Sequence, residues 1–155
     1  MPTADGFWFE DVFPGRVLRS ARAVRMDGGA IAAFARQFDL HPAHLSEETA
    51  AASMFGVSCA SGWHTGAVTM RLISETMPIA RGGTGAGIER LSWLRPVRPG
   101  DDLTIEIEIL AARVSRSRPD AGVVTYRCTT LNQEGAAVQQ FTTTVLFPCR
   151  NDGAV

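Results

Sequence analysis

An aspartate and two histidines stand within six residues, at Asp39, His41 and His44, in a chain that has three histidines in all. A carboxylate and a neutral imidazole form a sufficient acid–base pair, because one can take a proton from water while the other orients that water or returns a proton to carbon. Pro42 between them disfavours helix at the residue before it. We therefore expect a loop that turns Asp39 and His44 into one cleft, which this spacing would not allow on a continuous helix.

A second feature that bears on chemistry is the pair Ser61-Gly62, where we expect a central helix to begin. Backbone N–H groups at the start of a helix have no partner within it, and they stabilise an oxygen that gains negative charge in a transition state. The segment from Thr49 to Met70 carries no formal charge and is long enough to span a bilayer. Its serines, threonines and glycines make it too polar for a membrane helix, so we interpret it as a helix buried inside a soluble domain.

The elements that must position these residues are short helices upstream. Asp27 is placed to cap a helix over AIAAFARQF, whose apolar residues recur on one face. Ser46 is placed to cap a second, with two glutamates in the first turn, where the helix dipole favours anions. Gly56 is a residue type that commonly ends a helix. The two helices would therefore flank the Asp39–His44 loop.

The second half of the chain has the patterns of strands. LTIEIEIL alternates apolar and polar residues with a period of two, which predicts a strand with one buried and one wet face. IERLSWL precedes it, with RPVRPGDD as the turn. VVTYRCTTL and AVQQFTTTVLF follow, joined by a hairpin turn at residues 132–135. Helices first and antiparallel strands second indicate an α+β arrangement in which a sheet wraps a buried helix.

Size and charge limit the organisation and the partners. We expect one domain over residues 1–155, with a core from about 9 to 147 and a loose tail at 150–155. The net charge of −1 has both signs spread along the chain, which argues against nucleic-acid and membrane partners. Three cysteines, none in CxxC spacing, and an N-terminus unlike a secretory leader predict reduced thiols and a cytoplasmic protein.

Several other groups have simpler interpretations. Asp39 and the histidines match no tight metal-ligand motif, so we expect no metal. The glycines at 82, 83, 85 and 87 lack a phosphate-binding ending and predict a flexible connection. The arginines in RVSRSRP either contact phosphates of a ligand or form a solvated strand end, which we favour. Cys59 is interpreted as a small buried residue, because no basic partner is identifiable at close range.

The stretch FDLHPAHL followed by FGVSCASGWHT resembles the hydratase motif of MaoC-like proteins, the hotdog-fold (R)-specific enoyl-CoA hydratases and dehydratases. AIAAFARQFD and LSWLRPVRPGDDLTIEIEIL are similar to the family as well, so the likeness runs from about residue 9 to 147. Three departures flank the expected acyl pocket. His41 replaces the usual asparagine, Ser61-Gly62-Trp63-His64 replaces histidine-glycine-methionine, and Ser46 stands where an acid is common.

The resemblance implies a single hotdog domain, a long helix wrapped by an antiparallel sheet, and a homodimer or dimer-based oligomer with the thioester entering between subunits. It implies reversible syn addition of water to a trans-2-enoyl thioester of coenzyme A or an acyl carrier protein, as in fatty acid metabolism, without a cofactor. Asp39 and His44 match the catalytic pair, and the backbone N–H of Gly62 matches the oxyanion donor. The further residues expected near the substrate are His41, Ser61, Trp63 and His64, although the first interpretation of His41 is support of the loop and that of His64 is packing among the helices.

Two other functions remain open on the sequence. A hotdog thioesterase would hydrolyse the thioester and release free thiol, which hydration would not. A non-catalytic subunit that binds acyl thioesters would keep the fold without the chemistry, although neither Asp39 nor His44 has been lost. Fold likeness alone does not decide among these, because function resides in the site.

Overall fold

The computed structural model describes residues 6–150. After a short 3-10 turn at Phe9–Asp11, the elements in chain order are β1 (Val17–Arg19), β2 (Val24–Arg25), α1 (Gly28–Phe38), α2 (Pro42–Leu45), α3 (Glu47–Ala51), α4 (Gly62–Thr76), β3 (Thr84–Trp93), β4 (Asp102–Val114), β5 (Ala121–Leu131) and β6 (Ala137–Pro148). Helices precede the long strands, as the sequence pattern predicts. No helix among the described residues is both long and apolar enough to cross a membrane.

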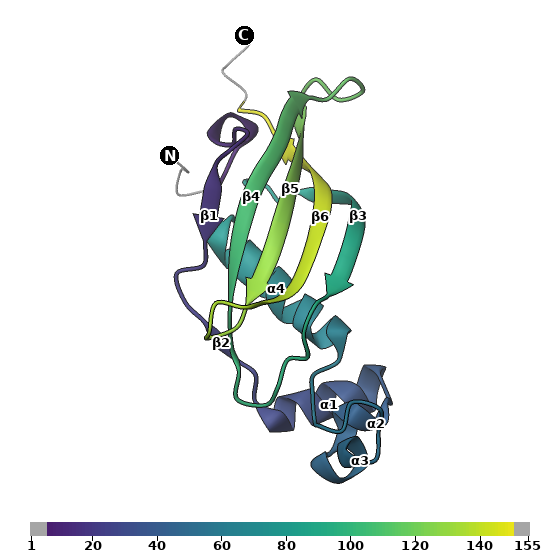
Figure 1. Ribbon diagram of the computed structural model, residues 1–155. Helices are drawn as coiled ribbons and strands as arrows, with labels where there is room; N and C mark the ends of the chain where they lie inside the picture. Colours follow the sequence, from purple (N-terminus) through teal and green to yellow (C-terminus); the bar gives the residue numbers. More distant parts are fainter. Residues whose placement is uncertain (1–5, 151–155) are drawn as a thin grey trace.

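The sheet is antiparallel and curves around α4 (Figure 1). Its strands are ordered β1-β4-β5-β6-β3, and β2 pairs with β4 beyond the end of β1. β4, β5 and β6 form long consecutive hairpins, and β3 forms the far edge beside β6. This confirms the predicted α+β arrangement of a sheet wrapped around a central helix.

The core lies between α4 and the concave face of the sheet. Leu103, Ile105, Ile107 and Ile109 are all almost fully buried, which confirms the period of two read in β4. The three isoleucines pack with apolar residues of the helix and of the neighbouring strands, among them Leu72, Ile73, Val124, Tyr126, Cys128, Phe141, Val145 and Phe147. Leu103 belongs to a second cluster, with Met26, Ile31, Ala60, Val97 and Val138. Burial of these side chains is the main force that holds the helix in the sheet.

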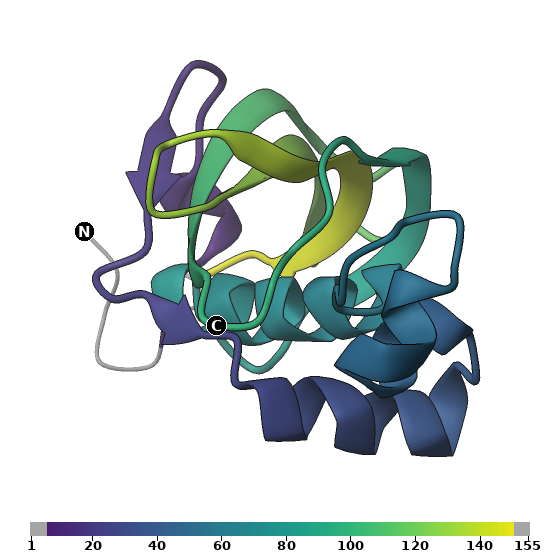
Figure 2. The same ribbon diagram turned by 60° about the horizontal axis from the view of Figure 1, so that its bottom comes forward.

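The three short helices gather at the N-terminal end of α4 (Figures 1 and 2). Both predicted caps are present, since the Asp27 carboxylate accepts from the Ala30 N–H and the Ser46 hydroxyl accepts from the Thr49 N–H. Ser46 also separates α2 from α3 with extended backbone. The loop from α1 to α2 is therefore held between two capped helices, beside the first turn of the central one.

Three details of the sequence interpretation were wrong. α3 ends at Ala51 and not at Gly56, which instead has a positive φ of 67° in the following turn. Gly85 and Gly87 belong to β3 and not to a flexible loop, because pairing with β6 holds this strand across a bulge. Arg150 is not loose, since its guanidinium donates to both carboxylate oxygens of buried Asp11. Residues 151–155 of the predicted tail lie outside the described part of the chain.

Candidate active site

The acid and the base of the predicted pair come from opposite sides of one short loop. Asp39 follows the last residue of α1, and His44 lies in α2, a helix of four residues. The Nδ1 atom of His41 accepts from the Ala43 N–H and so caps α2, with Pro42 in its first turn. The loop brings Asp39 Oδ2 to 3.6 Å from His44 Nε2, as the spacing predicts.

One backbone carbonyl sets the tautomer of His44. Its Nδ1 lies 2.7 Å from the carbonyl oxygen of Cys59, an atom that can only accept a hydrogen bond. Nδ1 must therefore carry the hydrogen, and in the neutral imidazole the lone pair lies on Nε2, which faces Asp39. The ring is 8% exposed, so this hydrogen bond also fixes its orientation. A neutral His44 in this position can accept a proton at Nε2.

Ser61 ties the carboxylate to the start of the central helix. Its hydroxyl donates to Asp39 Oδ2 at 2.6 Å and accepts from the Trp63 N–H at 3.2 Å, so the same oxygen caps α4. The separation between Asp39 Oδ2 and His44 Nε2 is longer than a hydrogen bond, so the two atoms are close enough for one water in the pocket to contact both. The acid, the base and the helix start thus form one connected unit.

Gly62, the first residue of α4, is packed so closely that no side chain fits there. A Cβ at this position would lie 2.3 Å from the Trp93 indole ring. The indole N–H of Trp93 points at both the Gly62 carbonyl oxygen, at 3.0 Å, and Gln139 Oε1, at 2.9 Å. The backbone at the start of α4 is therefore held from β3 and β6, with its free N–H groups at the helix terminus.

This contact extends into a buried polar network that the sequence analysis missed. The Gln139 side chain is fully buried and donates to Thr69 Oγ1 of α4, which in turn hydrogen-bonds the hydroxyl of Thr130 on β5. A polar residue at an inward position of an alternating strand is the signal that would have indicated it. Such a network is costly unless fully paired, and when paired it fixes one arrangement.

Asp39, His44 and Gly62 line a pocket of about 390 Å³, a size typical of small-molecule sites, together with mostly apolar residues. Of the residues expected at the substrate, His41 and Trp63 also line it. The other lining residues are Phe55, Cys59, Ala60, Thr65, Trp93, Leu94, Arg95, Pro96, Val97 and Val138.

His64 does not line this pocket. Its ring stacks on Phe34 of α1 with the centroids 4.8 Å apart, and its buried Nδ1 has no hydrogen-bond partner within residues 6–150. Burial lowers the pKa of His64, so the imidazole is neutral at pH 7. This placement makes the ring a packing contact between α1 and α4, and its expected contact with substrate remains a prediction.

Cys59 has a basic neighbour that the sequence did not indicate, because its Sγ lies 3.7 Å from His44 Nδ1. Burial raises the pKa of the Cys59 thiol, and the positive charge of Arg98 offsets this only in part. The His44 nitrogen that faces the sulfur already donates to a carbonyl and is no base. Cys59 therefore stays a neutral thiol, and its backbone oxygen has the larger role.

The structure also bears on two other sequence interpretations, those of the RVSRSRP arginines and of a metal site. The RVSRSRP arginines lie in and beyond the end of β4, at the other end of the sheet from the α1–α3 helices (Figure 1). Within one chain they are far from this pocket and form a solvated strand end. Among residues 6–150, no group of three or more histidine, cysteine or acidic side chains is arranged to hold a metal ion.

The chain is similar to known proteins both in sequence and in fold. The sequence profile of the MaoC like domain matches residues 11–132. The uncharacterized protein YdeM of Bacillus subtilis (strain 168) is 28% identical over 134 residues, covering 86% of this chain and 93% of its own.

Solved structures are similar over nearly the whole chain. A MaoC-like dehydratase from Rhodospirillum rubrum has 48% identity and a TM-score of 0.88, and the match covers 94% of this chain and 99% of that one. The (R)-hydratase from A. caviae involved in PHA biosynthesis has 26% identity and a TM-score of 0.72, with 90% and 99% covered. These likenesses identify the fold as the hotdog fold.

Proposed function

Because the chain belongs to the MaoC-like domain family, we propose that it is a hydro-lyase that adds water reversibly to a trans-2-enoyl thioester and forms the (R)-3-hydroxyacyl product. The observation that carries the proposal is the pairing of Asp39 with a tautomer-fixed His44 in a pocket that includes the first residue of α4. The likeness to an (R)-hydratase supports this type of reaction.

The pair is suited to hold one water molecule. The Asp39 carboxylate and the His44 Nε2 lone pair are both hydrogen-bond acceptors, 3.6 Å apart. A water between them donates one hydrogen to each, which leaves its oxygen lone pairs directed away from the pair. That oxygen attacks C3 of the enoyl group, and one of the two acceptors takes its proton as general base.

The first turn of α4 is suited to the charge that this attack creates. As the water oxygen bonds to C3, the electron pair of the double bond moves through C2 to the thioester carbonyl, which becomes an enolate oxygen. The N–H of Gly62, at the positive end of the helix dipole, donates to that oxygen. The close contact with Trp93 holds this peptide before the reaction begins, so little reorganisation is needed.

The reaction is completed when C2 takes a proton and the carbonyl double bond re-forms. The group that accepted the proton from water delivers it to C2, so no atom is gained or lost beyond the one water. Asp39 and His44 lie on the same side of the pocket, and the hydrogen and the hydroxyl therefore add to one face of the substrate. This is a syn addition, and dehydration is its reverse.

We further propose that two copies pair to form the working enzyme and that coenzyme A or an acyl carrier protein presents the thioester, with no other cofactor. β3 supports the pairing, because it is an edge strand of the sheet and nearly all of its residues are exposed. An unpaired edge of this length is commonly covered by another strand. Size-exclusion chromatography with light scattering tests the dimer directly.

The test of the reaction is an assay with crotonyl-CoA and longer trans-2-enoyl-CoA substrates. Loss of the conjugated enoyl absorbance without free thiol, abolished in both Asp39→Asn and His44→Ala, is the expected result. Release of free thiol would replace the hydratase by a thioesterase. Thioester binding without either change would indicate a non-catalytic binding subunit.

A further inference from the structure

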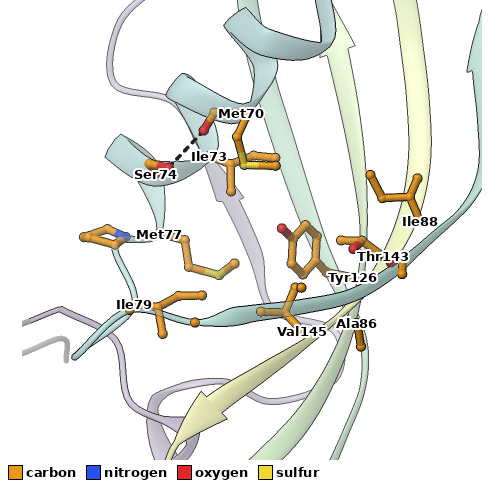
Figure 3. A pocket seen from close by; sticks show the side chains of 15 residues that line it. Met70, Ile73, Ser74, Met77, Ile79, Ala86, Ile88, Tyr126, Thr143 and Val145 are labelled. Carbon is orange, nitrogen blue, oxygen red and sulfur yellow. Dashed lines mark hydrogen bonds between the residues drawn. The ribbon is translucent and has the colours of Figure 1, made fainter. Parts of the chain in front are cut away.

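Most of the interface between α4 and the sheet is apolar. Beside the C-terminal half of the helix, a cavity of about 680 Å³ has an uncharged lining, in which Met70 and Ile73 lie opposite Tyr126 and Val145 (Figure 3). Nearer the N-terminal end, polar side chains enter the same interface. Burial of a polar group costs free energy unless the group is hydrogen-bonded, so the arrangement of these side chains calls for a reason beyond packing.

Three of the polar side chains form a row across the sheet. Thr130 of β5 is the cross-strand neighbour of Gln139 on β6, and Gln139 is the neighbour of Trp93 on β3. Thr130 and Gln139 are fully buried. The row therefore runs from the middle of the sheet to the strand that borders the proposed catalytic pocket.

One face of α4 lies against this row. Gly62, Gly66 and Thr69 follow one another at the i, i+4 and i+7 spacing of a single helix face. A Cβ at Gly66 would lie 3.8 Å from Gln139 Oε1, and one at Gly62 would overlap the Trp93 ring. The absence of side chains at the two glycines therefore lets the amide and the indole approach the helix backbone.

The hydrogen bonds determine which way the Gln139 amide points. An indole N–H can only donate, so the amide atom 2.9 Å from the Trp93 N–H must be the oxygen. The amide NH₂ then donates to Thr69 Oγ1 at 3.1 Å, and the Thr69 hydroxyl lies 2.7 Å from that of Thr130. The same indole N–H also points at the Gly62 carbonyl oxygen, at 3.0 Å. Gln139 thus connects the indole to the middle of the helix while the indole contacts its first residue.

Without Gln139, the contact between Trp93 and Gly62 would join a half-exposed side chain to a helix end. Trp93 is 47% exposed and belongs to an edge strand, so nothing else of comparable burial would prevent the indole and the carbonyl from moving together. The hydrogen bond to a fully buried amide removes this freedom. Gly62 is then held in one position, and with it the N–H that we assign to the thioester oxygen.

We propose that Gln139 is a positioning residue for the hydration, and that it acts through the Trp93 indole on the N–H of Gly62. The inference rests on the proposed function, because this N–H matters only where charge develops on a thioester oxygen. Gln139 does not line the pocket and transfers no proton. A donor that is in place before the charge develops needs no reorganisation, and complete loss of one costs on the order of 100-fold or more in rate. Loss of Gln139 loosens the donor without removing it, so it lowers kcat by less than this and leaves KM nearly unchanged.

Gln139→Leu and Gln140→Leu form a matched pair for the test. Gln139→Leu removes both amide hydrogen bonds, while Thr69 and Thr130 still bond each other. Gln140 is the next residue of β6 and points to the other face of the sheet, where its amide donates to Thr129 Oγ1. For crotonyl-CoA we expect kcat to fall on the order of tenfold in Gln139→Leu and to stay at the wild-type value in Gln140→Leu. Equal kcat values for Gln139→Leu and wild type would overturn the proposal.

Hydrogen exchange at the Trp93 indole tests the hydrogen bond without using the reaction. In ¹⁵N-labelled protein we expect this N–H to exchange with D₂O on the order of tenfold faster in Gln139→Leu than in wild type, and at the wild-type rate in Gln140→Leu. Unchanged exchange in Gln139→Leu would overturn the proposal at any level of activity. Faster exchange with unchanged kcat would reduce Gln139 to a structural residue. Failure of the wild-type protein to hydrate any enoyl-CoA would instead contradict the proposed function.

Trp93→Phe tests the path from Gln139 to Gly62. The variant keeps a ring beside Gly62 and removes the N–H, and its kcat should also fall on the order of tenfold. If Gln139 acts through this N–H, adding Gln139→Leu to Trp93→Phe should lower kcat no further. Losses that multiply in the double variant would contradict the assigned path. Urea unfolding of each variant establishes that the kinetics are those of folded protein.

Discussion

The two ends of α4 differ in how their polar groups are used. At the N-terminal end, Asp39, His44 and Ser61 each have a stated partner, and the helix start supplies free N–H groups. Toward the C-terminal end the cavity lining is uncharged, and the buried Thr76 hydroxyl has no hydrogen-bond partner among residues 6–150. The N-terminal end of α4 therefore lies beside groups suited to proton transfer, whereas its C-terminal half borders an apolar cavity.

The two ends of α4 differ mainly in how tightly their side chains are oriented. At the catalytic end, the Cys59 carbonyl chooses the tautomer of His44, and the cap residue Ser61 holds Asp39. These are short-range constraints on groups that must be oriented within a few tenths of an ångström. At the other end, methionine side chains and the glycines of β3 leave the space adaptable.

Removal of either member of the catalytic pair should have the largest effect. We expect Asp39→Asn and His44→Ala each to lower kcat for enoyl-CoA hydration on the order of 1,000-fold, because each removes an acceptor of the water proton. Steady-state kinetics at saturating substrate measure this, with circular dichroism as the check on folding. Tyr126→Phe, at the other end of the helix, is the matched control and should retain kcat. A loss of similar size in the control would abolish the contrast.

The fit of Gly62 against Trp93 is the next constraint. Gly62→Ala places a methyl group 2.3 Å from the indole ring, and it should destabilise the protein by about 1–3 kcal/mol through overpacking. It should also lower kcat, because the N–H at the helix start moves.

Gly66→Ala is the control within the same helix. The nearest atom, Gln139 Oε1, would lie at an ordinary 3.8 Å, and replacing a mid-helix glycine should raise the stability by up to about 1 kcal/mol. Urea unfolding measures both variants, and equal stabilities would show that the indole contact is not a constraint.

Ser61→Ala tests the bridge between the acid and the helix. The variant loses the hydrogen bond to Asp39 and the cap of α4, which should cost about 1 kcal/mol of stability. We expect kcat to fall on the order of tenfold with little change in KM, since the carboxylate is less well oriented but still present. Ser61→Thr keeps the hydroxyl and should recover most of the rate. A variant with full activity would remove Ser61 from the positioning of Asp39.

The smallest effect concerns His64. Burial holds its pKa below the ordinary value, so below about pH 6.5 the unfolded chain binds more protons at this residue than the folded one. The free energy of unfolding therefore rises as the pH increases toward about 6.5, and above that pH His64 causes no further change. His64→Phe should remove this dependence and so reduce the stability that is lost between pH 7 and pH 5. Denaturant midpoints measured against pH test it, and an unchanged slope would contradict the assignment.

Local patterns predicted much of this structure. Features that depend on residues near one another in sequence could be predicted from the sequence alone. These are the alternation in β4, the caps Asp27 and Ser46, and the approach of Asp39 to His44. The extent of β3 was missed because glycines signal loops, while pairing with β6 overrides that preference.

The partners that orient the pair could not be predicted in the same way. The Cys59 carbonyl lies 15 residues from His44, and Gln139 lies 46 residues from Trp93. Such contacts depend on how the helix sits in the sheet, which no local pattern encodes. The cavity beside Tyr126 was missed for the same reason, since three strands and a helix enclose it.

The central claim is that Asp39 and His44 act on one water from one face of the substrate. Hydration of crotonyl-CoA by the wild-type protein in D₂O, followed by NMR and chiral analysis of the product, tests it most directly. We expect (R)-3-hydroxybutyryl-CoA with deuterium at C2 on the same face as the new hydroxyl, formed on the order of 1,000-fold more slowly by Asp39→Asn. An (S) product, deuterium on the opposite face, or full activity of Asp39→Asn would contradict it.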